Sequence, residues 1–332
     1  MKTACIYHSR DLDGWMSAAI VKHWWKQNVG SDPNIEIEEN LVSNTLISRL
    51  KVSNSIDESI TFIGYDYGQP IPDLSEYDKV VMCDISLPKE MMELLFEKLD
   101  RNFIWNDHHV SALNDNKDIE DMVAGERGVS YAACELTWKY LYPDSPMPLI
   151  VYLLGRYDCF GHKGTPDEQK VLEFQYGARQ CISNYEEAYA FLSNVIKYND
   201  HEIERSISAQ GSAIYKYLCT EAKQIYKRAF PIILQEPTYD VNLVGAGIAK
   251  CNFLCVNQDR FNPINFGIDY HEDGYDGFAC FWLVNGRWSF SLYNDNGLVD
   301  CSIIAKGFYG GGHKGASGFV LEFDELDLIV KI

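Results

Sequence analysis

The segment Thr3-Ala-Cys-Ile-Tyr-His8-Ser-Arg-Asp11-Leu-Asp13-Gly14 joins a short apolar run directly to one histidine and two aspartates. Two later segments repeat this arrangement: Lys79-Val-Val-Met-Cys-Asp84 ends in an aspartate, and Asn102-Phe-Ile-Trp-Asn-Asp107-His108-His109 ends in an aspartate and two histidines. Short, continuous apolar runs are typical of strands that are buried on both faces, as in a parallel sheet. Polar groups are therefore expected directly after three successive strands.

Helical patterns alternate with these strands. One helical stretch passes through residues 18–24, another spans Lys89–Leu99, and Ile60–Gly64 is a further strand-like run. This alternation predicts an α/β fold with a mostly parallel sheet flanked by helices. From Tyr131 to about residue 228 the pattern is helical, and the later hairpin signal Asn285-Gly286 indicates a smaller α/β unit. We expect three parts: residues 1–183, a helical connector at 184–228, and residues 229–332.

The polar groups after the strands should converge, because ligands of open parallel sheets bind at the carboxyl ends of the strands. Crowded carboxylates need a counter-charge, and mixed oxygen and imidazole ligands suit Mn²⁺ or Mg²⁺, and less specifically Co²⁺ or Zn²⁺. Two such ions can activate water for attack on a phosphate ester. The simpler alternatives are that Asp11 or Asp13 caps a helix and that His108 is a buried core histidine. Asp66, which also follows an apolar run, is an alternative to Asp84 as the metal ligand.

A glycine-rich segment near the end of the chain has its own physical interpretation. Gly310, Gly311 and Gly312 can adopt positive φ and expose successive backbone N–H groups, which would form an anion-binding loop. His313 and Lys314 add donors beside it. The alternative is an ordinary flexible turn.

Five segments taken in order resemble the successive motifs of the DHH phosphoesterase superfamily with a DHHA1 domain. They are His8-Ser-Arg-Asp11-Leu-Asp13-Gly14, Val80-Val-Met-Cys-Asp84, Asn106-Asp107-His108-His109, Leu153-Leu-Gly-Arg-Tyr-Asp158 and Gly310-Gly311-Gly312-His313. The resemblance covers nearly the whole chain. It implies a DHH domain at 1–183, a connector, and a smaller DHHA1 domain at 229–332 that binds substrate.

The resemblance also implies a role for each matching residue. His8 and Asp11 would bind one metal ion, a second ion would be bound by Asp13, His108 and Asp158, and Asp84 would bridge the two. Asp107 would orient a histidine, and His109 would donate to the substrate phosphate. The segment Gly310–Lys314 would hold a terminal nucleotide or phosphate. Mn²⁺ is the expected ion, with Mg²⁺ or Co²⁺ as alternatives.

The net charge of −19 limits the class of substrate. Six basic and thirteen acidic residues from Ala229 onward give that part −7, which leaves −12 for the rest, so neither part is a basic clamp for long nucleic acid. We therefore expect hydrolysis of short oligonucleotides or nucleotide phosphoesters, and no binding of long duplexes. The alternatives are a single-strand exonuclease of the RecJ type, an inorganic pyrophosphatase and a non-catalytic nucleotide sensor.

The location of the protein is inferred from the same composition. No stretch reaches the roughly 18 apolar residues of a membrane helix, and the first residues lack an apolar signal region. We expect a cytoplasmic protein with no membrane partner. The sequence leaves the oligomeric state open, a homodimer included.

Overall fold

The computed structural model describes residues 1–28, 35–42, 45–52, 59–198, 201–234, 251–325 and 330–331. They belong to two compact units, Met1–Ile214 and Tyr215–Ile332. The boundary between the units lies within helix α8 (His201–Tyr226), whereas the sequence pattern ends the helical region near Ala229.

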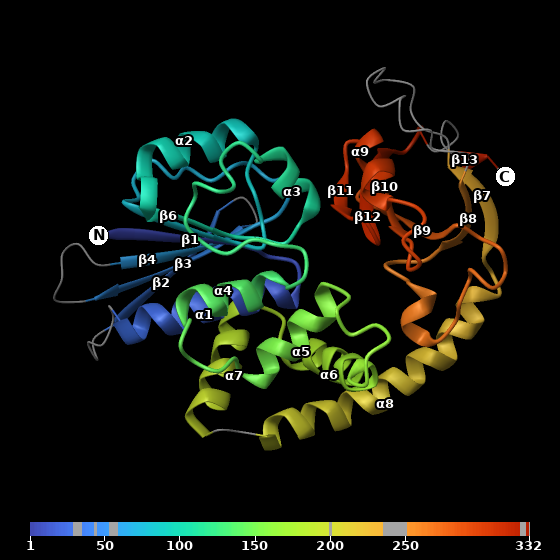
Figure 1. Ribbon diagram of the computed structural model, residues 1–332, viewed down its shortest axis with the longest axis horizontal. Helices are drawn as coiled ribbons and strands as arrows, with labels where there is room; N and C mark the ends of the chain where they lie inside the picture. Colours follow the sequence, from blue (N-terminus) through green and yellow to red (C-terminus); the bar gives the residue numbers. More distant parts are fainter. Residues whose placement is uncertain are drawn as a thin grey trace. The chain divides into compact units, whose positions relative to one another are not determined.

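The first unit is a six-stranded sheet with helices on both faces (Figure 1). In chain order its elements are β1 (Lys2–His8), α1 (Leu12–Asn28), β2 (Ile35–Val42), β3 (Thr45–Val52), β4 (Ser59–Tyr65), β5 (Lys79–Cys83), α2 (Lys89–Leu99), η1 (Asp100–Asn102), β6 (Phe103–Asn106), α3 (Val110–Asp115), α4 (Ala133–Leu141), α5 (Leu149–Asp158), α6 (Glu168–Cys181), α7 (Tyr185–Tyr198) and the first half of α8.

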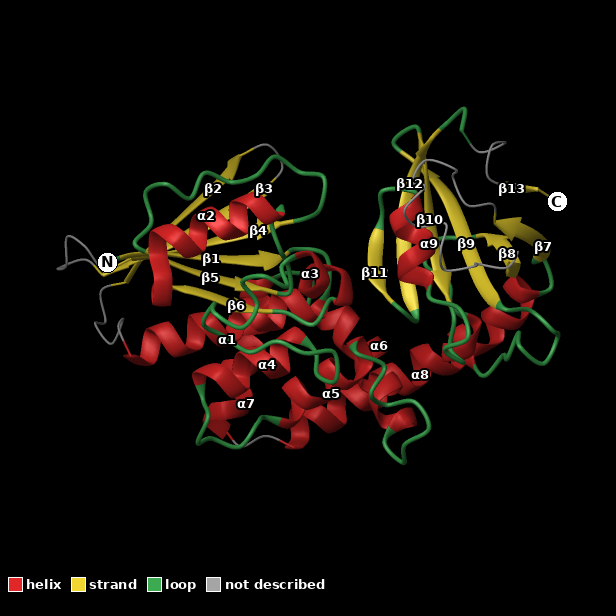
Figure 2. Ribbon diagram, turned by 45° about the horizontal axis from the view of Figure 1, so that its top comes forward, coloured by secondary structure: helices red, strands yellow, loops and turns green. Residues whose placement is uncertain are grey.

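The strand order is β2-β3-β4-β1-β5-β6, and β4, β1, β5 and β6 are parallel (Figure 2). This confirms the predicted α/β class and the mostly parallel sheet. The antiparallel pair β2 and β3 was not predicted, because Ile35-Glu-Ile-Glu-Glu-Asn-Leu-Val42 lacks a continuous apolar run. Helix α2 has the predicted bounds.

Alternate residues of the parallel strands form two cores, one on each face of the sheet. Ala4 and Ile6 of β1 pack in the same core as Met92 and Leu95 of α2. Cys5 and Tyr7, the neighbours of these β1 residues, belong to the opposite core, which α1 covers through Ala18, Val21 and Trp25. Because both faces are covered, only the edges and the ends of the strands remain for ligands.

The second unit is a seven-stranded sheet in the order β11-β12-β10-β9-β8-β7-β13. Among its described strands, β8 and β9 pair in parallel and the other neighbours are antiparallel. Helix α9 packs on one face of it (Figure 2). Its elements are β7 (Phe230–Leu234), β8 (Cys251–Asn257), η2 (Pro263–Phe266), β9 (Gly277–Val284), β10 (Arg287–Tyr293), α9 (Cys301–Gly307), β11 (Gly311–His313), β12 (Ala316–Glu322) and β13 (Val330–Lys331).

Two local predictions for this unit have opposite outcomes. The Asn285-Gly286 hairpin is confirmed, with φ values of +51° and +79° that suit a tight two-residue turn. The predicted glycine loop is wrong, because Gly311–His313 forms strand β11, antiparallel to the start of β12.

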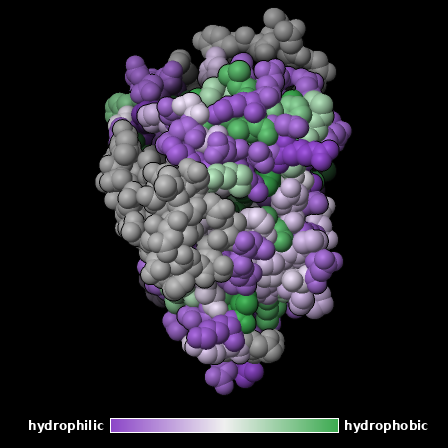
Figure 3. Space-filling view, turned by 90° about the vertical axis from the view of Figure 1, so that its left-hand side faces the viewer, coloured by the Kyte–Doolittle hydropathy of each residue, from purple (hydrophilic) through white to green (hydrophobic). Residues whose placement is uncertain are grey.

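None of the helices in the described ranges has the length and apolar character that crossing a membrane requires. The face drawn in Figure 3 is mostly hydrophilic, and its apolar side chains lie in small separate groups.

Candidate metal centre

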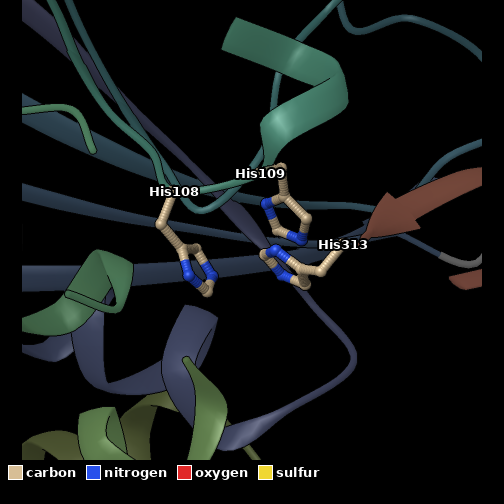
Figure 4. A group of neighbouring side chains, drawn as sticks. All are labelled: His108, His109 and His313. Carbon is tan, nitrogen blue, oxygen red and sulfur yellow. The ribbon is translucent and has the colours of Figure 1, made fainter. Parts of the chain in front are cut away.

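The carboxyl ends of three neighbouring strands bring the predicted side chains to one edge of the first sheet. His8 is the last residue of β1, Asp84 follows β5, and the Asp107-His108-His109 segment follows β6. These strands pair in parallel, β1 with β5 and β5 with β6. Figure 4 shows His108 and His109 on the connection from β6 to α3, and their ring centroids are 4.8 Å apart.

His8, Asp11 and Asp84 form a first group whose potential ligand atoms lie within 4.8 Å of one another. His8 Nδ1 is 3.0 Å from Asp11 Oδ2 and 3.3 Å from Asp84 Oδ2. Burial opposes the charged form of His8, but the Asp11 charge and the hydrogen bonds to its carboxylate neighbours outweigh this effect and raise the pKa of His8. The other Asp11 oxygen, Oδ1, accepts a hydrogen bond from the Gly14 amide at 3.0 Å, as a helix cap does.

Asp13, His108 and Asp158 form a second group of the same kind. His108 Nε2 lies 3.4 Å from Asp13 Oδ2 and 3.2 Å from Asp158 Oδ2. The two oxygens of Asp13 also accept the amides of Ala133 and Cys134 at 2.9 and 2.8 Å, at the beginning of α4. Burial and the charges of Asp84 and Asp158 raise the pKa of Asp13 well above its ordinary value. The carboxylates at this position therefore repel one another.

Asp84 lies between the two groups. Its Oδ2 faces His8 in the first group, and its Oδ1 is 3.2 Å from His108 Nε2 in the second. The side chain is 1% exposed, and its φ of +62° is in the left-handed region, which is uncommon for residues other than glycine. Strained backbone of this kind tends to cluster at functional sites.

Asp107 and His109 form a hydrogen-bonded pair beside these groups. Asp107 Oδ1 is 2.8 Å from His109 Nδ1 and accepts the amides of His108 and His109 at 2.7 and 3.1 Å. Burial raises the pKa of Asp107, but the nearby His109 outweighs burial and the pKa is lowered. An ionised Asp107 can only accept, so Nδ1 of His109 carries the hydrogen. Sequence reasoning missed a further donor to Asp107, Trp105 Nε1 at 3.2 Å.

The residues of the two groups fit divalent cations. They offer carboxylate oxygens and imidazole nitrogens, a donor set that suits Mn²⁺, Mg²⁺ or Zn²⁺. Asp84 Oδ1 is buried and accepts no hydrogen bond of good geometry from the described residues. A buried carboxylate oxygen without a donor is costly, and a cation would satisfy it while relieving the repulsion at Asp13.

Asp66, the rival of Asp84 in the sequence, lies at the margin of the first group. Its Oδ1 is 3.5 Å from His8 Nε2, and its Oδ2 accepts a hydrogen bond from Arg10 Nε at 2.5 Å. Burial raises the pKa of Asp66, but the hydrogen bond to His8 and the Arg10 charge lower it overall. The carboxylate of Asp66 is therefore already paired with an arginine, whereas the partners of Asp84 Oδ1 are His108 and His109, whose imidazole nitrogens can also bind a metal ion.

In the second unit, Gly310–Lys314 spans the end of the α9 connection and strand β11, which carries His313 (Figure 4). Of its three glycines only Gly312 has a positive φ, +134°. A Cβ at Gly310 would lie 2.1 Å from the Gly318 oxygen, and one at Gly312 would lie 2.7 Å from the Ala316 oxygen. Close packing against β12 is therefore sufficient to explain why glycine occupies positions 310 and 312.

Comparisons with known proteins agree with this fold. No family model matches the chain. An uncharacterized protein of Acanthamoeba polyphaga mimivirus is 24% identical over 97% of this chain and 70% of its own length. The solved DHH domain of a protein described as a member of a ribosomal protein family has a TM-score of 0.53 at 11% identity, covering 98% of this chain and 84% of that chain. This likeness shows that the chain has the fold of a DHH-domain protein.

A second solved structure, an exopolyphosphatase-related protein from Bacteroides fragilis, has a TM-score of 0.43 at 12% identity, covering 96% of this chain and 86% of that chain. This is a more distant likeness.

Proposed function

We propose that the protein is a metal-dependent phosphoesterase that hydrolyses short oligonucleotides or nucleotide phosphoesters. The observation that carries the proposal is the pair of carboxylate and imidazole groups that share Asp84. His8 and Asp11 would hold one divalent ion, Asp13, His108 and Asp158 would hold the other, and Asp84 would contact both. We propose Mn²⁺ as the ion, with Mg²⁺ or Co²⁺ as alternatives.

When bound, two divalent ions supply Lewis acidity and lower the pKa of water for attack on a phosphate. The chain holds the metal-binding side chains in position before the ions bind. The Gly14 amide holds Asp11, and the two amides at the beginning of α4 hold Asp13. Rigidly held ligands reduce the reorganisation that binding and reaction require. No side chain of the site is needed as a covalent nucleophile.

His109 is proposed to contact the substrate phosphate. Asp107 accepts hydrogen from His109 Nδ1, which fixes the orientation of the ring and directs Nε2 away from Asp107. A neighbouring carboxylate of this kind commonly orients functional histidines. In the second unit, His313 and Lys314 are proposed to hold one end of the substrate, together with the backbone of Gly310, Gly311 and Gly312.

The proposed size of the substrate rests on charge. With a net charge of −19, the chain has too few basic groups for a long polyanion, whose binding depends mainly on lysine and arginine contacts to phosphates. A short ester requires only a few contacts.

The test is hydrolysis of labelled RNA and DNA oligomers, from dinucleotides to about thirty nucleotides, with pyrophosphate alongside. We expect Mn²⁺-dependent turnover of the shortest oligomers. Preferential cleavage of long single strands would instead indicate an exonuclease of the RecJ type, turnover of pyrophosphate alone would indicate a pyrophosphatase, and binding of nucleotide without hydrolysis would indicate a sensor.

The matched variants are Asp84→Asn and Asp118→Asn. Asn has nearly the same shape as Asp and tolerates a positive φ, so Asp84→Asn should fold but lose hydrolysis and Mn²⁺ binding. Asp118 is an exposed aspartate that forms an ion pair with Lys89. Its replacement should change neither hydrolysis nor Mn²⁺ binding. Hydrolysis at the wild-type rate by Asp84→Asn would contradict the proposed centre. A further variant, His313→Ala, should raise the KM with little change in kcat.

A further inference from the structure

Arg179, in the last turn of α6, holds its guanidinium in a defined position although the residue is exposed. The guanidinium carbon lies 5.3 Å from the ring centroid of Tyr157 and 5.2 Å from that of Tyr176. Arg179 Nη2 also donates a hydrogen bond to the Tyr157 hydroxyl at 3.4 Å. Cation–π contacts to two rings restrict a side chain that is otherwise flexible.

This guanidinium lies near the candidate metal centre. Tyr157 directly precedes Asp158, whose carboxylate is 3.2 Å from His108 Nε2. The Tyr157 ring is itself stacked on His162, with centroids 5.6 Å apart and an interplanar angle of 7°. Tyr157 is the main cause of a raised pKa at Arg179, and the charge of Asp11 adds to it. Through its contact with Tyr157, the Arg179 guanidinium lies beside the end of α5, which carries Asp158.

Arg179 differs from the other arginines of this edge in its partners. Arg10 is paired with Asp66, and Arg156 is paired with the buried Glu135. No carboxylate of the described residues forms an ion pair with Arg179. An arginine that is held in place by aromatic rings, and not by a carboxylate, keeps its planar set of donors for an external anion.

We propose that Arg179 binds the non-bridging oxygens of a substrate phosphate at the metal centre. This proposal rests on the proposed phosphoesterase function and adds a substrate-binding residue to it. A guanidinium matches a phosphate in a two-point geometry that an ammonium group cannot reproduce. In a chain of net charge −19, a cation at this edge also reduces the repulsion that an approaching phosphate meets.

The test compares Arg179→Gln and Arg179→Lys with Lys170→Gln. Lys170 is on the same helix and carries the same charge. It pairs at 3.4 Å with the buried Glu204, to which a glutamine at position 170 can still donate a hydrogen bond. The probe is inorganic phosphate, titrated calorimetrically into the Mn²⁺-loaded protein. Arg179→Gln should weaken phosphate binding by about tenfold to a hundredfold, the effect of losing a charged hydrogen bond. Arg179→Lys should lie between Arg179→Gln and the wild type, and Lys170→Gln should match the wild type.

Further measurements separate a binding role from a structural one. Melting temperature and Mn²⁺ affinity of Arg179→Gln should stay near wild-type values, while the KM for a dinucleotide rises more than kcat falls. Wild-type phosphate affinity in Arg179→Gln, an equal loss in Lys170→Gln, or no phosphate binding by the wild type would overturn the proposal. If the wild type hydrolyses no ester but binds phosphate through Arg179, the anion site stands and the phosphoesterase function fails.

Discussion

Gly14, in the first turn of α1, lies close against the end of β1. A Cβ at this position would lie 2.0 Å from the His8 oxygen and 2.9 Å from the His8 Cβ. Gly14 has no positive φ, so the conflict is purely steric. The Gly14→Ala variant therefore tests whether the close approach of strand and helix positions the ligands that flank it.

The expected magnitude follows from that distance. Real Cβ contacts essentially never fall below 3.0 Å, so the His8 carbonyl and the first turn of α1 must separate by at least about 1 Å. Overpacking of this kind costs about 1 to 3 kcal/mol, which corresponds to a fall in Tm of between about 2 and 12 °C for a unit of this size. A displacement of about 1 Å between His8 and Asp11 should also reduce hydrolysis about a hundredfold.

The assay is thermal unfolding together with Mn²⁺-dependent hydrolysis of a dinucleotide. The control is Ser17→Ala on the same helix, because the Ser17 hydroxyl is buried and has no hydrogen-bond partner among the described residues. Its removal should leave both measurements close to wild type or raise the Tm slightly. Gly14→Ala with the Tm and hydrolysis rate of the wild type would refute the steric reasoning.

Four further predictions concern separate features of the chain. Chelation should lower the Tm of the wild type by about 5 to 11 °C relative to metal at a hundred times its Kd, and should leave Asp84→Asn unchanged. Asp107→Asn removes the charge that orients His109 and should reduce kcat about tenfold to a hundredfold in steady-state assays. Tyr309→Gly relieves a φ of +58° at a 94% exposed residue and should stabilise the second unit by about 1 kcal/mol in calorimetry. Burial lowers the pKa of Lys163 to about 8. The unfolded chain therefore binds more protons between about pH 8 and 10, and the free energy of unfolding should rise with pH there in urea titrations, but less so in Lys163→Met.

The position of the site could be predicted because parallel strands leave a clear pattern in the sequence. β4 is buried at every residue and β5 at all but its first, so each appears as an apolar run whose end is marked by a polar residue. The edge of the sheet then follows from the general rule for open α/β sheets. Asp158 has no such mark, because it ends helix α5, and only the family resemblance indicated it.

Other features depend on contacts that have no local signal. The amides that hold Asp13 are 120 and 121 residues away in the chain, at the beginning of α4. The left-handed conformation of Asp84 is imposed by its surroundings, and glycine or asparagine would be the usual residue there. The glycines at 310 and 312 suggested a loop because glycine is common in turns, but close approach to β12 also requires the absence of a Cβ.

The two alternatives for the Asp-x-Asp-Gly segment, helix caps or metal ligands, prove to be compatible, because each carboxylate has two oxygens. Asp11 caps α1 with Oδ1 while Oδ2 faces His8, and Asp13 receives the α4 amides while Oδ2 also faces His108. Substitution of either aspartate would remove a helix cap worth about 1 kcal/mol as well as a ligand, so lost activity alone would not distinguish these roles. Asp84 Oδ1 has no such structural duty among the described residues. Asp84 is therefore the position at which a loss of metal binding can be separated from a loss of stability.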